Sequence, residues 1–326
     1  MWTRWILACS LPCLLMAAPA AARTVHLPKP ARGQQVRMTP FTVQPSGERE
    51  VCEYRRLANR KTVDAQEFEF AASPGTHHIA VWAYFGRDRD PSNFPSKPTD
   101  TPGCTGFGPA DSFNKSILAG SSRGGRYAVR FPEGIALRLA PHQPVFLNAH
   151  YRNGSPDVLR PEIVFNVTPA KRGTVRHHAE SLTVGNYDIT VPAHSTATLV
   201  SEWRAPIDLN VIQLSSHQHK RGTRFTVERL EGNVNMGQFY VTTNWETPTQ
   251  LWPPEPMRVR AGDGFRFTCE WKNDEDHPVR FGVTTDDEMC FVTGYYYRDD
   301  ESDTLPVFPR CFPQDAGLLC AAATVR

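Results

Sequence analysis

The sequence predicts an all-β protein built from two domains. Proline and glycine are frequent, at 28 and 22 of 326 residues, which leaves little room for long helices. Short segments that alternate polar and apolar residues, or are rich in β-branched and aromatic ones, recur between them. About 300 residues remain after a predicted signal peptide is removed, and typical domains contain roughly 100 to 200, so we expect two.

The first half of the chain contains two apolar runs. Residues 145–151 predict a strand, and residues 163–167 follow as a second apolar run. The next stretch, residues 171–173, is basic and contains glycine, so we place the domain boundary there. The two domains are therefore expected at residues 23–172 and 173–326.

The second half repeats the strand pattern several times. Its segments either alternate polar and apolar residues or are dominated by β-branched and aromatic ones, with proline or glycine in between. Four of them predict strands: residues 187–191, 197–203, 224–229 and 265–269.

Residues 1–22 are typical of a signal peptide. A short positive region contains Arg4, an apolar stretch follows at residues 5–16, and the alanines at 20–22 provide a small-residue cleavage site. The apolar stretch is too short for a stable anchor, and no later segment approaches the roughly 20 apolar residues of a membrane helix. We expect a secreted or periplasmic protein without a membrane span.

The charge of the chain is nearly balanced. Lys and Arg number 36, Asp and Glu number 34, and the formal net charge is +2. Proteins that follow a nucleic-acid backbone need an excess of positive charge to contact its phosphates. We therefore expect no nucleic-acid partner.

The predicted mature chain has an even number of cysteines. In an exported protein such a set implies disulfides. Six cysteines allow 15 pairings, and the sequence alone does not select one. The six are Cys52, Cys104, Cys269, Cys290, Cys311 and Cys320.

His217 and His219 are separated by one residue. On an extended strand such a pair projects from the same side and can bind one ion, with Gln218 turned away. Met289 follows seventy residues later, and a thioether favours Cu(I), so two imidazoles with a thioether indicate redox copper. Taken alone, the two histidines also fit a solvated strand edge or one arm of a zinc site.

A second group of histidines lies in the first half. His77 and His78 follow the Pro74–Gly75 turn, and His150 lies on the predicted strand at residues 145–151. Adjacent residues on a regular strand point to opposite faces, so His77 and His78 can share a metal only if the turn distorts the backbone.

A histidine doublet is weak evidence without a partner. His177 and His178 are also adjacent, but no third histidine in a strand context accompanies them. The number of histidines therefore does not identify a metal site.

The order of all the candidate ligands, however, resembles a known family. The ligands occur as His77, His78, His150, His217, His219 and Met289. This series is similar to the copper type II, ascorbate-dependent monooxygenases, the family of peptidylglycine hydroxylating monooxygenase and dopamine β-hydroxylase. Residues 148–151 and 287–290, followed by Tyr295 and Tyr296, are close to the family's signatures. The resemblance covers nearly the whole mature chain and implies two consecutive antiparallel β-sandwich domains of jelly-roll type.

The resemblance also implies a division of labour between two copper ions. His77, His78 and His150 would hold the copper that donates electrons. His217, His219 and Met289 would hold the copper that binds dioxygen and hydroxylates the substrate. Hydroxylation of a C–H bond needs two electrons and one copper stores one, so a second copper and a reductant such as ascorbate are expected.

The resemblance also bears on the disulfides, and metal sites in general have partners that orient their ligands. The resemblance favours Cys269 with Cys290, next to Met289. Cys52 with Cys104 would bracket the first histidine turn, and Cys311 with Cys320 is the pair that remains. Asn148 and Gln213 are candidates to orient the histidine rings, although both also fit as ordinary polar strand residues.

Three positions depart from the peptide-amidating branch of the family. Ser215, Phe291 and Thr293 stand where that branch has an Arg, an Asn and a Tyr that bind a substrate carboxylate. Without a charge-assisted clamp, glycine-extended peptides are not the expected substrates. We expect instead a copper-dependent monooxygenase acting on a small organic substrate with dioxygen.

Two other functions fit parts of the sequence. One is a copper-binding or electron-transfer protein of the same fold that has lost turnover, but the six intact ligand positions favour the enzyme. The other is a zinc hydrolase. Methionine is a poor zinc ligand and no HExxH motif accompanies the histidines, so zinc is disfavoured.

Overall fold

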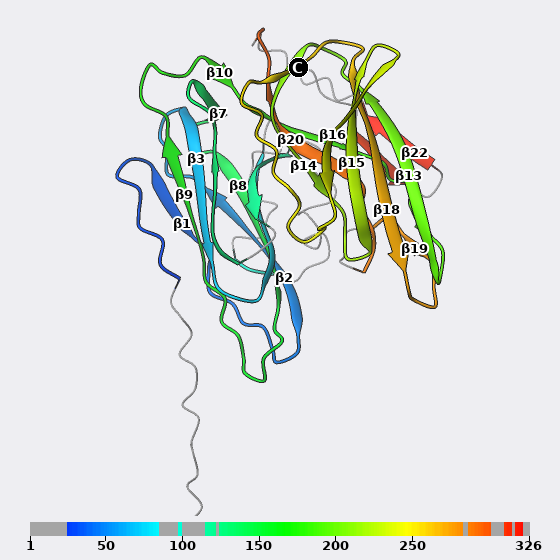
Figure 1. Cartoon of the computed structure of the whole chain (residues 1–326). Helices are drawn as coiled ribbons and strands as arrows, with labels where there is room; N and C mark the ends of the chain where they lie inside the picture. Colours follow the sequence, from blue (N-terminus) through cyan, green and yellow to red (C-terminus); the bar gives the residue numbers. More distant parts are fainter. Residues whose placement is uncertain are drawn as a thin grey trace, which may run out of the picture.

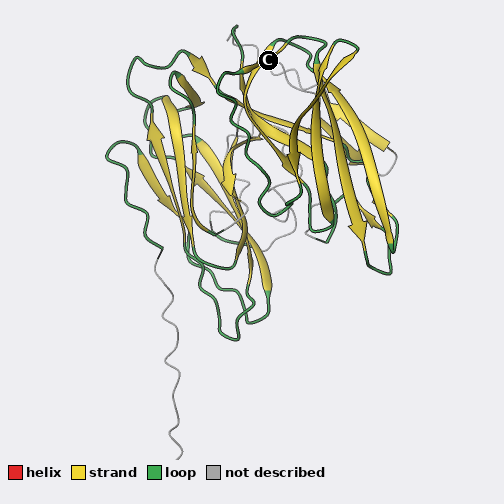
Figure 2. Ribbon diagram, in the orientation of Figure 1, coloured by secondary structure: helices red, strands yellow, loops and turns green. Residues whose placement is uncertain are grey.

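The computed structural model is all-β, as the sequence predicts (Figures 1 and 2). It describes residues 25–84, 97–99, 115–121, 124–282, 286–300, 310–314 and 317–321. Within these ranges no helix has the length and apolarity needed to cross a membrane. The predicted signal peptide and Cys104 lie outside the described residues.

The first half of the chain forms two facing sheets. One has the strand order β1-β9-β3-β7-β10, with β6 also paired to β3, and the other has the order β2-β8-β4-β5. The strands are β1 (Gln34–Arg37), β2 (Glu48–Arg56), β3 (Val63–Ala72), β4 (Thr76–Tyr84), β5 (Lys115–Ser121), β6 (Gly125–Arg130), β7 (Ile135–Leu139), β8 (Pro144–Arg152), β9 (Ile163–Pro169) and β10 (His177–His178).

The second half forms another pair of sheets beside the first (Figure 1). Their orders are β11-β20-β14-β17 and β13-β18-β15-β16, and β12-β19 and β21-β22 are separate two-stranded pairs. The strands are β11 (Glu180–Gly185), β12 (Thr190–Val191), β13 (Ser195–Arg204), β14 (Leu209–His217), β15 (Gly222–Glu231), β16 (Val234–Thr242), β17 (Met257–Val259), β18 (Gly264–Asn273), β19 (Val279–Arg280), β20 (Phe291–Tyr297), β21 (Arg310–Gln314) and β22 (Gly317–Ala321).

Four of the five predicted strands coincide with long strands, but residues 187–191 do not. Only Thr190 and Val191 are extended there. Asn186 accepts a hydrogen bond from the backbone N–H of Asp188 through its side chain, which forms a turn. The ring of Tyr187 meanwhile packs edge-on against Phe281, at 4.8 Å between centroids. Local turn chemistry therefore overrides the alternating pattern.

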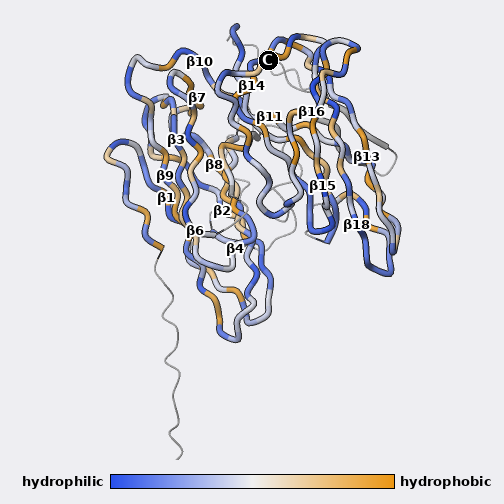
Figure 3. Tube along the Cα trace, viewed as in Figure 1, coloured by the Kyte–Doolittle hydropathy of each residue, from blue (hydrophilic) through white to orange (hydrophobic). Residues whose placement is uncertain are grey.

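Successive side chains of β8 point alternately into two different apolar clusters. Val145, Leu147 and Ala149 belong to the main core of the first sandwich. Phe146 lies on the other face in a small cluster with Cys52 and Tyr54. Because side chains alternate along a strand, Asn148 and His150 share the outer face with Phe146. The apolar residues recur along the strands of both sandwiches, and many connecting loops are hydrophilic (Figure 3).

The two sandwiches are joined by buried aromatic contacts. Tyr295 on β20 belongs to the core of the first sandwich, and its hydroxyl donates to the carbonyl of Leu118 at 3.0 Å. Its ring meets Phe131 edge-on, with centroids 5.0 Å apart. Ile212 on β14 packs into the same core. A continuous apolar contact therefore fixes the face of β14 and β20 against the first sandwich.

The chain passes from one sandwich to the other near Ala179. β10 pairs with β7 of the first sandwich, and Ala179 packs in the first core. β11 begins at the next residue and pairs with β20. The predicted boundary after residue 172 lies a few residues earlier and stays a prediction.

Candidate metal centre

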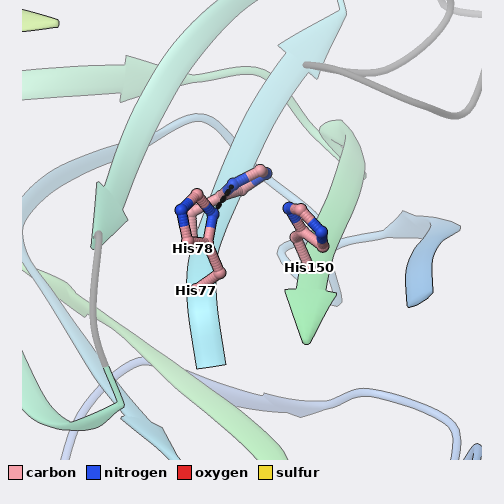
Figure 4. A group of neighbouring side chains, drawn as sticks. All are labelled: His77, His78 and His150. Atoms are coloured by element: carbon pink, nitrogen blue, oxygen red, sulfur yellow. Dashed lines mark hydrogen bonds between the residues drawn. The ribbon is translucent and has the colours of Figure 1, made fainter. Parts of the chain in front are cut away.

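Three histidines of the first sandwich converge on one point (Figure 4). His77 and His78 come from β4, and His150 comes from the neighbouring strand β8. Each offers one ring nitrogen, and these atoms all lie within 4.8 Å of one another. The ring centroids are 4.9 Å apart for His77 and His150 and 5.1 Å apart for His78 and His150. This is the arrangement of a three-nitrogen metal site.

A β-bulge allows adjacent histidines to share this site. Thr76 is opposite Tyr151 and His78 is opposite His150, so His77 is the extra residue between the two pairs. The bulge breaks the alternation that would otherwise send His77 to the opposite face. The distortion expected near the Pro74–Gly75 turn is therefore present, and it takes this form.

Hydrogen bonds determine which ring nitrogens can bind a metal. The Nε2 of His150 lies 2.5 Å from Oε1 of Glu48, and the Nε2 of His78 lies 2.8 Å from Oδ1 of Asn148. Carboxylate and amide oxygens accept hydrogen bonds, so each Nε2 carries the proton and each Nδ1 keeps its lone pair. The Nδ1 atoms of His77 and His78 face one another at 3.3 Å.

The electrostatics of the cluster favour neutral rings. Burial, followed by charge on His78 and His150, lowers the pKa of His77 to about 3. Burial is also the main cause that lowers the pKa of His150. Buried Nε2 of His77 has no hydrogen-bond partner. Neutral imidazole is the form that binds metals, so these residues fit a metal ion.

The second pair of histidines lies at the end of β14. The ring centroids of His217 and His219 are 5.1 Å apart and their planes are nearly perpendicular. The Nδ1 of His219 donates to the carbonyl of Asp287 at 3.0 Å, which leaves its Nε2 lone pair available. Burial lowers the pKa of His217, and burial lowers that of His219 to about 4. Both rings are therefore neutral at physiological pH.

Met289 is held beside this pair by the backbone around it. His217 is opposite Phe291 in the β14–β20 pair, so Met289, two residues before Phe291, lies close to the end of the strand that carries His217. The thioether side chain is buried, with 3% exposure. The disulfide between Cys269 and Cys290 ties the residue after Met289 to β18.

Glu288 is a buried acidic residue beside the candidate ligands that the sequence patterns do not single out. This buried carboxylate accepts the backbone N–H groups of His219 and Arg221, at 3.0 and 2.9 Å, and the indole N–H of Trp271 at 2.8 Å. Burial raises its pKa to about 7. Through these hydrogen bonds Glu288, which directly precedes Met289, holds the turn that carries His219. The Asp-Glu-Met-Cys motif contains it, but no periodic pattern marks a charged residue as buried.

The two sets of histidines face one another between the sandwiches. Charge on His219 is among the causes that lower the pKa of His77, and charge on His78 is among those that lower the pKa of His217. The indole of Trp245, from the second sandwich, lies 5.8 Å from the ring of His77. The two sets are therefore close enough for a charge on one to affect the pKa of the other.

Of the two residues predicted to orient the histidine rings, only Asn148 is hydrogen-bonded to one of them. Asn148 is hydrogen-bonded to His78, but the side-chain amide of Gln213 donates to Gln250 at 2.6 Å. His178 pairs with Asp64, and the ring of His177 stacks on Tyr297 with centroids 4.2 Å apart. The second doublet therefore contacts the strands around the inter-domain crossing.

The cysteines give one resolved bridge. Cys269 and Cys290 form the disulfide that the family pattern favours. Cys52 is also disulfide-bonded. Cys311 and Cys320 are directly opposite in the β21–β22 pair. The pairings of Cys52 with Cys104 and of Cys311 with Cys320 stay predictions.

The second sandwich also matches a known family. Residues 188–312 match the model of the copper type II ascorbate-dependent monooxygenase, C-terminal domain. This part of the chain is therefore similar to the C-terminal domain of those enzymes. The match confirms the resemblance seen in the order of the ligands. The matched range includes His217, His219 and Met289.

The chain has only a distant likeness to solved structures. The major capsid protein P2 from bacteriophage PM2 is similar with a TM-score of 0.34 and 6% identity, over 82% of this chain and 97% of that one. PNGF-II is similar with a TM-score of 0.34 and 9% identity, over 76% of this chain and 59% of that one. Scores this low carry no argument about function. No curated protein matches the sequence.

Proposed function

We propose that this chain is an exported monooxygenase that binds two copper ions and hydroxylates a C–H bond of a small organic substrate. It uses dioxygen and a reductant of the ascorbate class. One observation carries the proposal: the three-histidine cluster lies close enough to His219 to feel its charge, and His219 belongs to the region that matches a copper monooxygenase domain. Export is supported by the signal-like residues 1–22 and by the disulfide.

The two ligand sets divide the work by their chemistry. His77, His78 and His150 offer nitrogen ligands alone, which suits a one-electron carrier. His217, His219 and Met289 add a soft thioether, which stabilises Cu(I) and leaves positions open for dioxygen. When bound, the two copper ions would supply the two electrons that hydroxylation requires. The remaining task of the chain is to hold both sets and admit the substrate between them.

The surface next to the histidine pair selects the substrate. Ser215 is opposite Thr293, and His217 is opposite Phe291, so these four side chains share the face of β14 and β20 that meets the first sandwich. Ser215 donates to the carbonyl of Thr249 at 3.0 Å. The four side chains are neutral. They suit an uncharged or weakly polar substrate and lack the cation that would bind a carboxylate.

The test combines metal analysis with oxygen uptake. The purified mature chain should bind two copper ions and consume oxygen in the presence of ascorbate with a member of a panel of amines, alcohols and peptides. His77→Ala with His78→Ala should remove one copper and abolish coupled oxygen uptake. A single copper in the wild type would contradict the two-site proposal. Two copper ions without turnover on any panel member would instead indicate a copper-binding or electron-transfer protein of this fold.

A further inference from the structure

Two glutamates of β2 lie behind the three-histidine cluster. β2 is the neighbour of β8 in the sheet, and β8 is the neighbour of β4. Glu50 is directly opposite His150, and His150 is directly opposite His78, so the three form one cross-strand row. Glu48, two residues earlier, projects from the same face.

Both carboxylates are connected to the outer nitrogens of the ligand rings. Glu48 accepts from Nε2 of His150 at 2.5 Å. Glu50 accepts from the amide of Asn148 at 2.8 Å, and its Oε1 lies 3.6 Å from Nε2 of His78. Asn148 in turn bridges Glu50 and His78. The inner Nδ1 atoms are therefore oriented by groups that lie outside the ligand set.

The two carboxylates differ in how strongly their charge acts on the site. The side chain of Glu50 is 11% exposed, whereas that of Glu48 is 47% exposed and lies 3.7 Å from the guanidinium of Arg152. Solvent and the neighbouring cation screen the charge of Glu48. Glu50 is the more buried of the two, so solvent screens its charge less, and Glu48 forms the more direct hydrogen bond.

We propose that Glu48 and Glu50 are positioning residues that make the three-histidine site a better electron donor. The inference rests on the proposed function. Three neutral imidazoles contribute no charge, so nearby carboxylates stabilise a doubly charged ion more than a singly charged one. A site that favours Cu(II) gives up its electron more readily. The electron given up there would go to a copper held by His217, His219 and Met289, and an ascorbate-class reductant would replace it.

The experiment isolates the first site in the full chain. In a His217→Ala, His219→Ala background, Cu(II) and Cu(I) affinities are measured by chelator competition and the midpoint potential by redox titration. Glu50→Gln should lower Cu(II) affinity about 10- to 100-fold, the usual effect of losing a partner of a metal ligand, with a much smaller change for Cu(I). The potential should rise by about 59 mV for each tenfold change in the affinity ratio. Glu48→Gln should give a smaller rise.

Two further variants keep the test sharp. Glu50→Asp retains the charge and should keep the potential near that of the background protein. Glu67→Gln is the control, since Glu67 pairs with Arg130 on β3 and β6 in the opposing sheet. Equal losses of Cu(I) and Cu(II) affinity, or an unchanged potential in Glu50→Gln, would overturn the inference. If the background protein binds no copper, the proposed function itself fails.

Discussion

Trp245 of the second sandwich covers the ring of His77 in the first, with centroids 5.8 Å apart and planes tilted by 39°. The contact joins a loop after β16 to the bulge that brings His77 into the metal cluster. The second half of the chain therefore contributes to the surroundings of the three-histidine cluster. Burial is the largest cause that lowers the pKa of His77, and the indole of Trp245 is one of the groups packed near its ring.

The contact predicts a change in the pKa of His77. Trp245→Leu removes part of the indole that shields the ring, so the pKa of His77 in the metal-free protein should rise from about 3 toward 6.5. NMR titration of the histidine ring protons measures it. Trp203→Leu, in a strand of the outer sheet of the second sandwich, is the matched control and should leave His77 unchanged. An unaltered pKa in Trp245→Leu would show that the indole does not bury His77.

Metal-free protein should lose stability in acid because its ligand histidines are buried as neutral rings. The pKa of His219 is about 4 in the folded state, compared with 6.5 in the unfolded state. The unfolded chain thus binds more protons between these values, and stability falls as the pH drops from 6.5 to 4, by at most roughly 1.4 kcal/mol per pH unit for this residue. Urea denaturation across this range measures the slope.

His219→Gln should flatten that slope, and His277→Gln is its control. The side chain of His277 is 69% exposed and pairs with Glu275. If the stability of His219→Gln falls with pH as steeply as that of the wild type, other groups cause the acid sensitivity.

Glu288→Gln should weaken copper binding at the histidine–methionine set. The amide oxygen can replace one carboxylate oxygen, but the amide nitrogen then faces an N–H donor of His219, Arg221 or Trp271. The turn that carries His219 should shift, and copper affinity should fall about 10- to 100-fold at this site. Copper titration of the variant in a His77→Ala, His78→Ala background measures it. Unchanged affinity would leave Glu288 with a role in folding alone.

Cys269→Ser should lower the free energy of unfolding by about 2 to 5 kcal/mol, the usual cost of losing a native disulfide. The bridge holds Cys290, the residue after Met289, so affinity should fall more at that copper site than at the three-histidine site. Non-reducing peptide mapping, chemical denaturation and copper titration test the three parts. Equal losses of copper affinity at both sites would mean that the disulfide does not position Met289.

Met289→His should retain copper but impair oxygen chemistry. Imidazole is a harder ligand than a thioether, so the variant should favour Cu(II) over Cu(I). Oxygen uptake with ascorbate and copper content are measured on the same preparation. If Met289→His consumes oxygen at the wild-type rate, Met289 is not a ligand of the proposed oxygen site.

The sequence by itself determined the all-β class and the candidate ligands. Strand periodicity needs only neighbouring residues, so it identified residues 145–151, 197–203, 224–229 and 265–269. The order of the histidines and Met289 indicated the family, and the match over residues 188–312 confirms it. Residues 187–191 were mispredicted because a side-chain hydrogen bond of Asn186 turns the backbone there.

Only the tertiary structure decided how these residues meet. The bulge at His77 depends on pairing with β8, which lies about seventy residues away. Glu48, Glu50 and Glu288 look like ordinary charged residues in the sequence, because their contacts come from strands and turns distant along the chain. Burial and cross-strand register are properties of the folded sheets. They give these carboxylates partners that local patterns do not contain.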